Sequence, residues 1–364
     1  MPRGLYIHVP FCASKCAYCD FYSGVSSEKT LDEYLSALMR EAEKLPKENL
    51  STLYLGGGTP SLLGAERIYR LVSFLRERFG NFSEATLEAN PADELFEIFS
   101  ASFSAGINRV SLGAQSGNER ELELLDRRHS AGQIASAVLA AKRAGIDNIS
   151  LDIMLGIPEQ TEESLLSTID YFCSLEPRHI SSYMLSLEEG TPLYKNREKY
   201  KFPSPEKTAD LYLLASSELE KRGYMQYEIS NWAKEGFEAR HNLNYWRGGE
   251  YYALGPAAHG FIKGERYAYP ADLRAFISSP QKRVIDSGGG REEYLMLNLR
   301  LKRGVVFSEY EEKFGKFPEE IIKKARLFEK SGLLEIDENH IAFKTEGFLL
   351  FNELFVKITE GAEL

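Results

Sequence analysis

Three of the four cysteines lie within eight residues of one another. Cys12, Cys16 and Cys19 form the pattern CxxxCxxC in FCASKCAYCDF, directly after the strand-like stretch GLYIHVP. Three thiolates on one short loop could bind a [4Fe–4S] cluster, leaving one iron open to a non-protein ligand, or a zinc ion. Structural zinc usually takes four protein ligands, and the remaining Cys173 stands alone in a helical pattern. The spacing therefore favours an iron–sulfur cluster over zinc or three incidental thiols.

Two further segments that could bind a ligand follow predicted strands. Gly57, Gly58 and Thr59 belong to GGGTP, where glycines let the backbone approach a ligand and offer N–H groups to a carboxylate. Glu88, in LEANP, could accept a hydrogen bond from an ammonium or a ribose hydroxyl. Taken alone, a glycine-rich turn and a solvated carboxylate are ordinary features. Their position at the carboxyl ends of strands favours a site.

Short β-branched segments alternate with amphipathic helical segments as far as residue 187, a pattern typical of a parallel sheet. In the helix expected over 66–79, Ile68, Leu71, Val72, Leu75 and Phe79 recur at the spacing of one buried face. Six strand–helix units predict an α/β fold, a partial (β/α)6 barrel rather than an open doubly wound sheet. The six strands are expected at 5–9, 52–56, 85–89, 109–113, 149–155 and 179–185.

The alternation of predicted strands and helices ends after residue 190. A helix is expected from an N-cap at Ser204 to Gly223, followed by a region rich in Tyr, Trp and Gly. Towards the end, Ser308 and Glu311 suggest a capping box, and LLEIDENHIAFKT suggests a two-stranded wing. Three regions follow: the barrel over 1–187, a barrel extension over 188–289, and a small α+β, winged-helix-like domain over 290–364.

Composition excludes several classes of protein. The 364 residues are 43% hydrophobic and 27% charged, as in a globular chain, and contain neither a long apolar segment nor a signal-peptide pattern. A cytosolic location with reduced cysteines is expected. The net charge of −10 argues against nucleic acid as a partner. The possible winged helix agrees, because residues 305–364 hold 8 Lys and Arg against 13 Asp and Glu.

The cysteine motif, with aromatic Tyr18 before its last cysteine, resembles the signature of the radical S-adenosylmethionine (SAM) superfamily. The resemblance implies a barrel, a [4Fe–4S] cluster on the three cysteines, SAM on its unique iron, and an electron donor to the cluster. It also implies that the GGGTP turn contacts the methionyl part of SAM, beside which Glu88 could accept its hydrogen bond. By motif, further SAM contacts are Tyr6, Gln115, Arg127 and Asp152. One departure is Asp126, which stands where the family commonly has glycine before its arginine.

Within that superfamily the chain resembles the oxygen-independent coproporphyrinogen III oxidase family over nearly its whole length, through LYIHVPFC, GGGTP, GAQS and LDIMLGIPEQT. The oxidases carry a further cysteine where this chain has Phe21, which argues against oxidative decarboxylation of porphyrinogen propionates. HNLNYW, from His241 to Trp246, is similar to the mark of the heme-chaperone branch. That branch implies heme as a ligand, heme-accepting proteins as partners, and transient membrane association through acceptors.

Several histidines are candidate heme ligands or structural residues. His241 could ligate heme iron while Tyr245 and Trp246 pack against the macrocycle, although a histidine among aromatic residues is more often structural. His259, in AAHGF, is an alternative ligand or part of a tight turn. His8 is expected to support the cysteine loop through a hydrogen bond.

Overall fold

The computed structural model describes residues 3–92 and 94–362 of the chain. Its central feature is a 12-stranded sheet, in the order β12-β11-β10-β9-β1-β2-β3-β4-β5-β6-β8-β7. The first six strands are parallel neighbours in chain order, which confirms the partial (β/α)6 barrel. They are β1 (Gly4–Val9), β2 (Thr52–Gly57), β3 (Glu84–Ala89), β4 (Arg109–Gln115), β5 (Asn148–Leu155) and β6 (His179–Met184), each within two residues of its predicted bounds.

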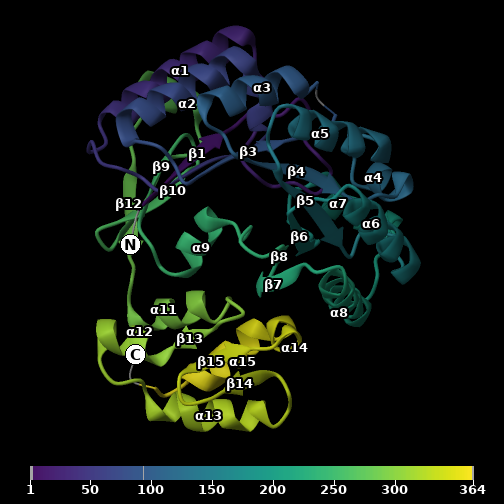
Figure 1. Ribbon diagram of the computed structural model, residues 1–364, viewed down its shortest axis with the longest axis vertical. Coiled ribbons are helices and arrows are strands. Elements are labelled where there is room, and N and C mark those ends of the chain that lie inside the picture. The colour runs from purple at the N-terminus through teal and green to yellow at the C-terminus, as the bar shows by residue number, and fades with distance from the viewer. Residues whose placement is uncertain (1–2, 93, 363–364) are drawn as a thin grey trace.

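Helices cover the outer, convex face of the sheet, as Figure 1 shows for α1, α2, α3, α5, α6 and α8. The apolar face predicted for α2 is confirmed, because Ile68, Leu71, Val72, Leu75 and Phe79 are all fully buried. The helices of this region are α1 (Glu28–Glu43), η1 (Pro60–Leu63), α2 (Gly64–Phe79), α3 (Phe96–Ala105), α4 (Glu119–Leu124), α5 (Ala131–Arg143), α6 (Glu162–Ser174), α7 (Pro192–Lys195), η2 (Arg197–Lys199) and α8 (Pro205–Lys221).

The segment after α8 adds strands to both ends of the same sheet. An antiparallel pair extends the β6 end, while β9 pairs in parallel with β1 and leads into three antiparallel strands. Helix α9 lies on the concave side of the curved sheet (Figure 1). The elements are β7 (Met225–Glu228), β8 (Asn231–Ala233), α9 (Arg240–Trp246), β9 (Tyr251–Leu254), β10 (His259–Ile262), β11 (Glu265–Ala268), α10 (Leu273–Ser278) and β12 (Arg283–Ser287).

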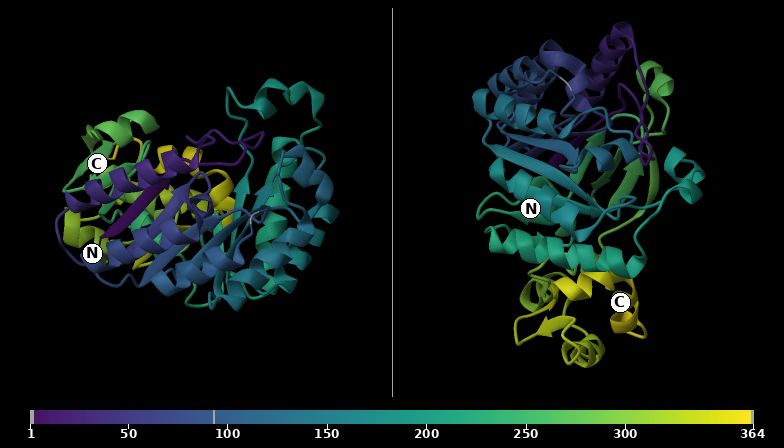
Figure 2. Two further views of the ribbon diagram at one scale, coloured as in Figure 1. Left: turned by 90° about the horizontal axis from the view of Figure 1, so that it is seen from above. Right: turned by 90° about the vertical axis from the view of Figure 1, so that its right-hand side faces the viewer.

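The C-terminal segment forms a separate lobe with its own three-stranded sheet, visible below the barrel in the right-hand view of Figure 2. Backbone hydrogen bonds from Ile229 to Arg300 and from Lys302 to Tyr227 attach this lobe to the end of β7. The predicted wing is confirmed as the β14–β15 hairpin. The elements are α11 (Arg291–Asn298), β13 (Val305–Val306), α12 (Phe307–Phe314), α13 (Glu319–Glu329), β14 (Leu334–Ile336), β15 (His340–Phe343), α14 (Thr345–Leu349) and α15 (Phe351–Thr359).

Two helix starts were predicted from capping residues, with different outcomes. Ser204 caps α8 as expected, because its hydroxyl accepts the Lys207 N–H at 3.2 Å. The capping box at Ser308 is wrong, since α12 begins at Phe307 with Val306 as its N-cap. The Glu311 carboxylate instead accepts the backbone N–H of Phe317 at 3.3 Å. β13 ends immediately before this helix, so strand pairing sets the start of α12.

Candidate functional site

The three clustered cysteines lie on a loop that leaves the carboxyl end of β1. Backbone hydrogen bonds of 3.0 Å, from Gly24 to Pro10 and from Cys12 to Gly24, close the base of this loop. All three cysteines are partly buried free thiols. Burial raises the pKa of the Cys19 thiol, and the neighbouring Cys16 and Cys12 thiols raise it further. The three thiols therefore lie on one closed loop.

Side chains from two distant segments contact these thiols. The Thr59 hydroxyl, in the turn after β2, lies 3.6 Å from the Cys12 sulfur. The Arg127 guanidinium, just after α4, donates to the Cys16 sulfur at 3.3 Å. A cation beside a thiol favours the thiolate that binds metal. The fold thus brings the cysteine loop, GGGTP and the DRRH segment together.

The arrangement of the thiols bears on what they could bind. In the described part of the chain, no three His, Cys, Asp or Glu side chains are grouped to hold one metal ion. A tetrahedral zinc site with Zn–S bonds of about 2.3 Å would need its thiolates around a single point. Ligands of a cluster bind separate irons and need not converge so closely. Three thiols on one loop, with Cys173 elsewhere, are a donor set that fits a [4Fe–4S] cluster with one open iron.

The glycine-rich turn packs tightly against the cysteine loop. A Cβ at Gly58 would lie 2.5 Å from the Phe11 carbonyl oxygen, so only glycine fits there. The sequence predicts that this turn offers N–H groups to a carboxylate, and within the protein Gly57 donates its N–H to the Glu88 carboxylate at 3.1 Å. Gly58 and Thr59 donate their N–H groups to Val9 and Phe11 at 2.8 and 2.7 Å. The turn positions the loop through these bonds.

Two acidic side chains lie on the inner face of the barrel. Glu88 accepts from the Tyr54 hydroxyl at 2.6 Å and from the Gly57 N–H at 3.1 Å. Burial raises the pKa of Glu88 to about 7, and nearby Asp152 contributes. Burial likewise raises the pKa of Asp152 to about 6. The buried Oδ1 of Asp152 has no hydrogen-bond partner among the described residues, so it is an acceptor available to a ligand hydroxyl.

Arg127 and Gln115 meet at the end of β4. Arg127 donates to the Gly113 carbonyl, and a Cβ at Gly113 would lie 3.1 Å from both side chains. Gln115 is buried and has a φ of +68° where β4 is irregular. Asp126 has a φ of +53°, a conformation that favours glycine but that aspartate adopts more readily than most residues. The turn before Arg127 is therefore formed by an aspartate in a backbone conformation that glycine adopts more often.

Aromatic side chains complete the surroundings of the cysteine loop. The Tyr18 hydroxyl lies 3.5 Å from Arg127 Nη1, and its ring packs against Leu125, Met154 and Ile157. The Tyr6 hydroxyl lies 3.0 Å from His8 Nδ1. His8 Nε2 lies 2.9 Å from the carbonyl oxygen of Tyr22. His8 thus supports the loop through a hydrogen bond, as expected.

Glu121 is a buried residue of the site that the sequence analysis missed. Its carboxylate accepts from the hydroxyls of Ser116 and Ser164, both at 2.6 Å, and from Gln160 Nε2 at 3.4 Å. Gln160 also accepts the Gly156 N–H at 2.7 Å. One carboxylate thereby joins the turn after β4 to the turn after β5. The sequence pattern around Glu121 does not indicate a buried residue, because a glutamate at the start of a helix is usually solvated.

His241 lies at the amino end of β2, where its ring also stacks on Tyr54, the residue that donates to Glu88. Its Nδ1 is 2.8 Å from the hydroxyl of Thr52, the first residue of β2, and its Nε2 is 2.6 Å from the Tyr245 hydroxyl. Five residues along β2, at about 3.3 Å each, separate Thr52 from Gly57 by roughly 16 Å. His241 is buried, and burial lowers its pKa to about 3. Both ring nitrogens are engaged, which favours the structural alternative over heme ligation.

The rest of HNLNYW connects the barrel to the C-terminal lobe. The backbone N–H groups of Arg240 and His241 donate to Glu84, the first residue of β3, at 2.8 and 2.9 Å. The Trp246 ring lies 5.4 Å from the Arg300 guanidinium carbon. Helix α9 is therefore held against the amino ends of the strands. His259, the alternative ligand, begins β10 and is exposed.

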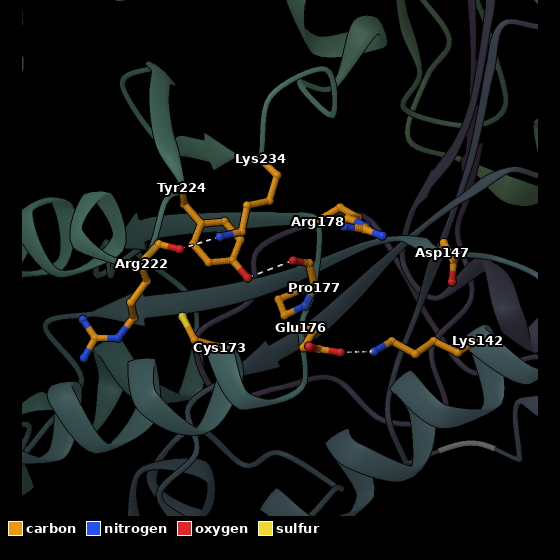
Figure 3. Close-up of a pocket in the computed structure, with 9 residues that line it drawn as sticks. All are labelled: Lys142, Asp147, Cys173, Glu176, Pro177, Arg178, Arg222, Tyr224 and Lys234. Atoms are coloured by element: carbon orange, nitrogen blue, oxygen red, sulfur yellow. Dashed lines mark hydrogen bonds and ion pairs between the residues drawn. The ribbon is translucent and has the colours of Figure 1, made fainter.

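Cys173 lies apart from the other cysteines. It lines a cavity of about 620 Å³ beside Arg222, Tyr224 and Lys234 (Figure 3). The cavity lies near the amino ends of β5 and β6, and none of the predicted site residues lines it. Cys173 therefore does not supply a fourth thiolate to the cysteine loop.

Comparisons with known proteins agree with this geometry. The radical SAM superfamily model matches residues 6–172, and the HemN C-terminal domain model matches residues 291–350. The structure of coproporphyrinogen III oxidase HemN from Escherichia coli superimposes with a TM-score of 0.82 at 23% identity, covering 99% of this chain and 90% of that one. This likeness establishes the fold.

Curated relatives match the chain over nearly its whole length. The heme chaperone HemW of Lactococcus lactis is 35% identical, over 98% of this chain and 97% of its own. HemW of Bacillus subtilis is 34% identical, over 97% and 98%. No helix in the described ranges is long and apolar enough to cross a membrane. With cysteine motif, barrel and C-terminal domain all matched, the chain belongs to the radical SAM superfamily and, within it, to the HemW family.

Proposed function

We propose that this protein is a heme chaperone that binds heme, a [4Fe–4S] cluster and SAM, and transfers heme to acceptor proteins. Full-length similarity to curated proteins named heme chaperone HemW carries the proposal. Phe21 supports it against the oxidase alternative, because phenylalanine supplies no thiol at the position where the oxidases have a further cysteine. In this proposal the protein's partners are heme-accepting proteins and an electron donor to the cluster.

The residues around the cysteine loop have separate roles in this proposal. Cys12, Cys16 and Cys19 would hold the cluster, which supplies one-electron chemistry to SAM when bound. Arg127 beside Cys16 would balance thiolate charge, as its 3.3 Å contact supports. Tyr18 would shield that side of the loop from water.

The SAM contacts follow from donor and acceptor chemistry. The Glu88 carboxylate would accept hydrogen bonds from the SAM ammonium group. Asp152, whose Oδ1 has no partner among the described residues, would accept hydrogen bonds from ribose hydroxyls. Gln115, held in its positive-φ turn, would present its amide beside them. Tyr6 and the 57–59 turn would keep the cysteine loop in place through His8 and Phe11.

The proposal is tested by titrating hemin into the anaerobically reconstituted protein and following the Soret band, beside a coproporphyrinogen III turnover assay. We expect saturable one-to-one binding, delivery of heme to an apo-acceptor hemoprotein, and no porphyrinogen consumption. Failure to bind hemin, together with SAM-dependent consumption of coproporphyrinogen III, would establish the oxidase alternative instead.

A further inference from the structure

A cleft of about 860 Å³ opens where α9, the four strands of the β9–β12 sheet end and helix α11 meet. Its lining residues come from the barrel extension and from α11 of the C-terminal lobe, elements that are labelled in Figure 1. Five of its lining side chains are aromatic or aliphatic, namely Tyr245, Tyr251, Phe261, Met296 and Leu297, and four are charged, namely Arg266, Arg291, Glu292 and Glu293. The aromatic and aliphatic part of this lining suits a flat apolar ligand.

The aromatic wall is preorganised. The rings of Tyr245 and Tyr251 lie 4.4 Å apart at 61°, an edge-to-face contact. The Tyr245 hydroxyl is anchored to His241 at 2.6 Å, and His241 is anchored to Thr52. The histidine of HNLNYW therefore fixes one wall of the cleft without entering it.

The two arginines at the cleft differ in whether acidic side chains neutralise them. Arg266 forms ion pairs with Asp286 and Glu293, so its charge is already balanced. Arg291, at the start of α11, is exposed and donates to the Phe314 carbonyl at 2.9 Å. Over residues 3–92 and 94–362, no carboxylate pairs with Arg291. Its guanidinium can therefore bind a ligand carboxylate at the edge of the cleft.

The lining of the cleft includes neither histidine nor cysteine. Its groups of types known to ligate heme iron are the Met296 thioether and the hydroxyls of its tyrosines. Since the Tyr245 hydroxyl is held by His241, Met296 and Tyr251 remain. A thioether or a neutral phenol is a weaker ligand than imidazole, which suits a carrier that must release its cargo.

We propose that this cleft is the heme site, with the macrocycle against Tyr245 and Phe261, iron facing Met296 or Tyr251, and a propionate at Arg291. The inference rests on the proposed function and adds the site to it. Tyr251 begins β9 and pairs with Gly4, the first residue of β1, so the cleft is at the amino ends of the strands. Heme there is separated from the cysteine loop by the length of the barrel strands.

The test is hemin titration of the reconstituted full-length protein. A Met296→Ala/Tyr251→Phe double variant and Arg291→Ala are compared with a matched control, Met225→Ala/Tyr69→Phe, at residues 61% and 48% exposed and outside the cleft lining. We expect the double variant to weaken hemin binding at least about tenfold and to shift the Soret band, because the iron loses its ligands. Arg291→Ala should weaken binding by about five- to tenfold, through loss of one charge-assisted contact.

The outcomes separate the two proposals. Saturable hemin binding by the wild type and by both cleft variants, with equal affinity and spectrum, would overturn the cleft and leave the chaperone function standing. No saturable binding by the wild type would overturn both. Circular dichroism and cluster absorbance of each variant show whether it has folded. If the double variant does not fold, the hemin affinity of Arg291→Ala decides the question, because the exposed Arg291 side chain is not part of the core.

Discussion

The imidazole of His241 joins two elements that are far apart in the sequence, with Nδ1 2.8 Å from Thr52 Oγ1 on β2 and Nε2 2.6 Å from Tyr245 on α9. The close approach of Gly4 reinforces the contact, since a Cβ there would lie 3.1 Å from the His241 ring. A family-marking histidine thus serves as a structural link at the base of the barrel.

The first prediction concerns the stability of this link. His241→Ala should lower the free energy of unfolding by about 2–4 kcal/mol, because it leaves a cavity and two unpaired hydroxyls. Denaturant unfolding measures the change, with exposed His259→Ala as the control expected to stay within about 0.5 kcal/mol. Unchanged stability combined with lost hemin binding would instead identify His241 as the heme ligand.

The cysteine loop gives a second prediction. Cys16→Ala should abolish cluster absorbance near the visible range while the far-ultraviolet circular dichroism is retained, since a cluster with two protein thiolates is poorly held. Cys173→Ala, in the separate cavity of Figure 3, should keep full iron content. Full cluster iron in Cys16→Ala would show that the assigned ligands are wrong.

The raised pKa of Glu88, about 7, predicts how SAM affinity depends on pH. The SAM ammonium pairs with ionised Glu88, so binding at a pH below 7 must first remove a proton. Affinity should fall by up to about tenfold per pH unit as the pH drops below 7, and level off above it. Isothermal titration calorimetry between pH 6 and 8 measures this dependence.

The matched variant for that experiment is Glu88→Gln, which keeps the size of the side chain but cannot ionise. It should bind SAM more weakly than the wild type and lose most of the pH dependence. What remains towards pH 6 belongs to Asp152, whose pKa is about 6. A wild-type affinity that is constant between pH 6 and 8 would contradict the role given to Glu88.

Glu121 provides a prediction about positioning. Glu121→Gln should weaken SAM binding by about tenfold with cluster absorbance unchanged, because an amide cannot accept from Ser116, Ser164 and Gln160 together. The turns that carry Gln115 and follow Asp152 would then shift. SAM calorimetry and the SAM-induced change in the reduced cluster's electron paramagnetic resonance spectrum measure the effect.

A control separates positioning from stability in that experiment. Glu41→Gln alters another buried carboxylate, one that contacts Lys44 and Tyr269 on the outer side of the barrel. It should lower stability without changing SAM affinity. If Glu121→Gln behaves in the same way, the network is structural only.

The sequence by itself determined the strand–helix series, the apolar face of α2 and the cysteine motif. Each depends on residues near one another in the chain: alternation along a strand, the three- and four-residue spacing of a helix, three thiols on one loop. Local patterns of this kind survive folding because backbone geometry imposes them directly. The capping box at Ser308 failed because strand pairing between β13 and β15 overrode a local preference.

Only the tertiary structure decided where the remaining residues act. It brought Arg127 to Cys16 across 111 positions and placed His241 on Thr52 across 189, at the amino end of β2. In the folded chain, residues 225–287 extend the sheet at both ends, and this extension helps to form the cleft that Tyr251 and Met296 line. Such contacts depend on which strands become neighbours and on which face each side chain lies, and no short window of sequence contains both partners.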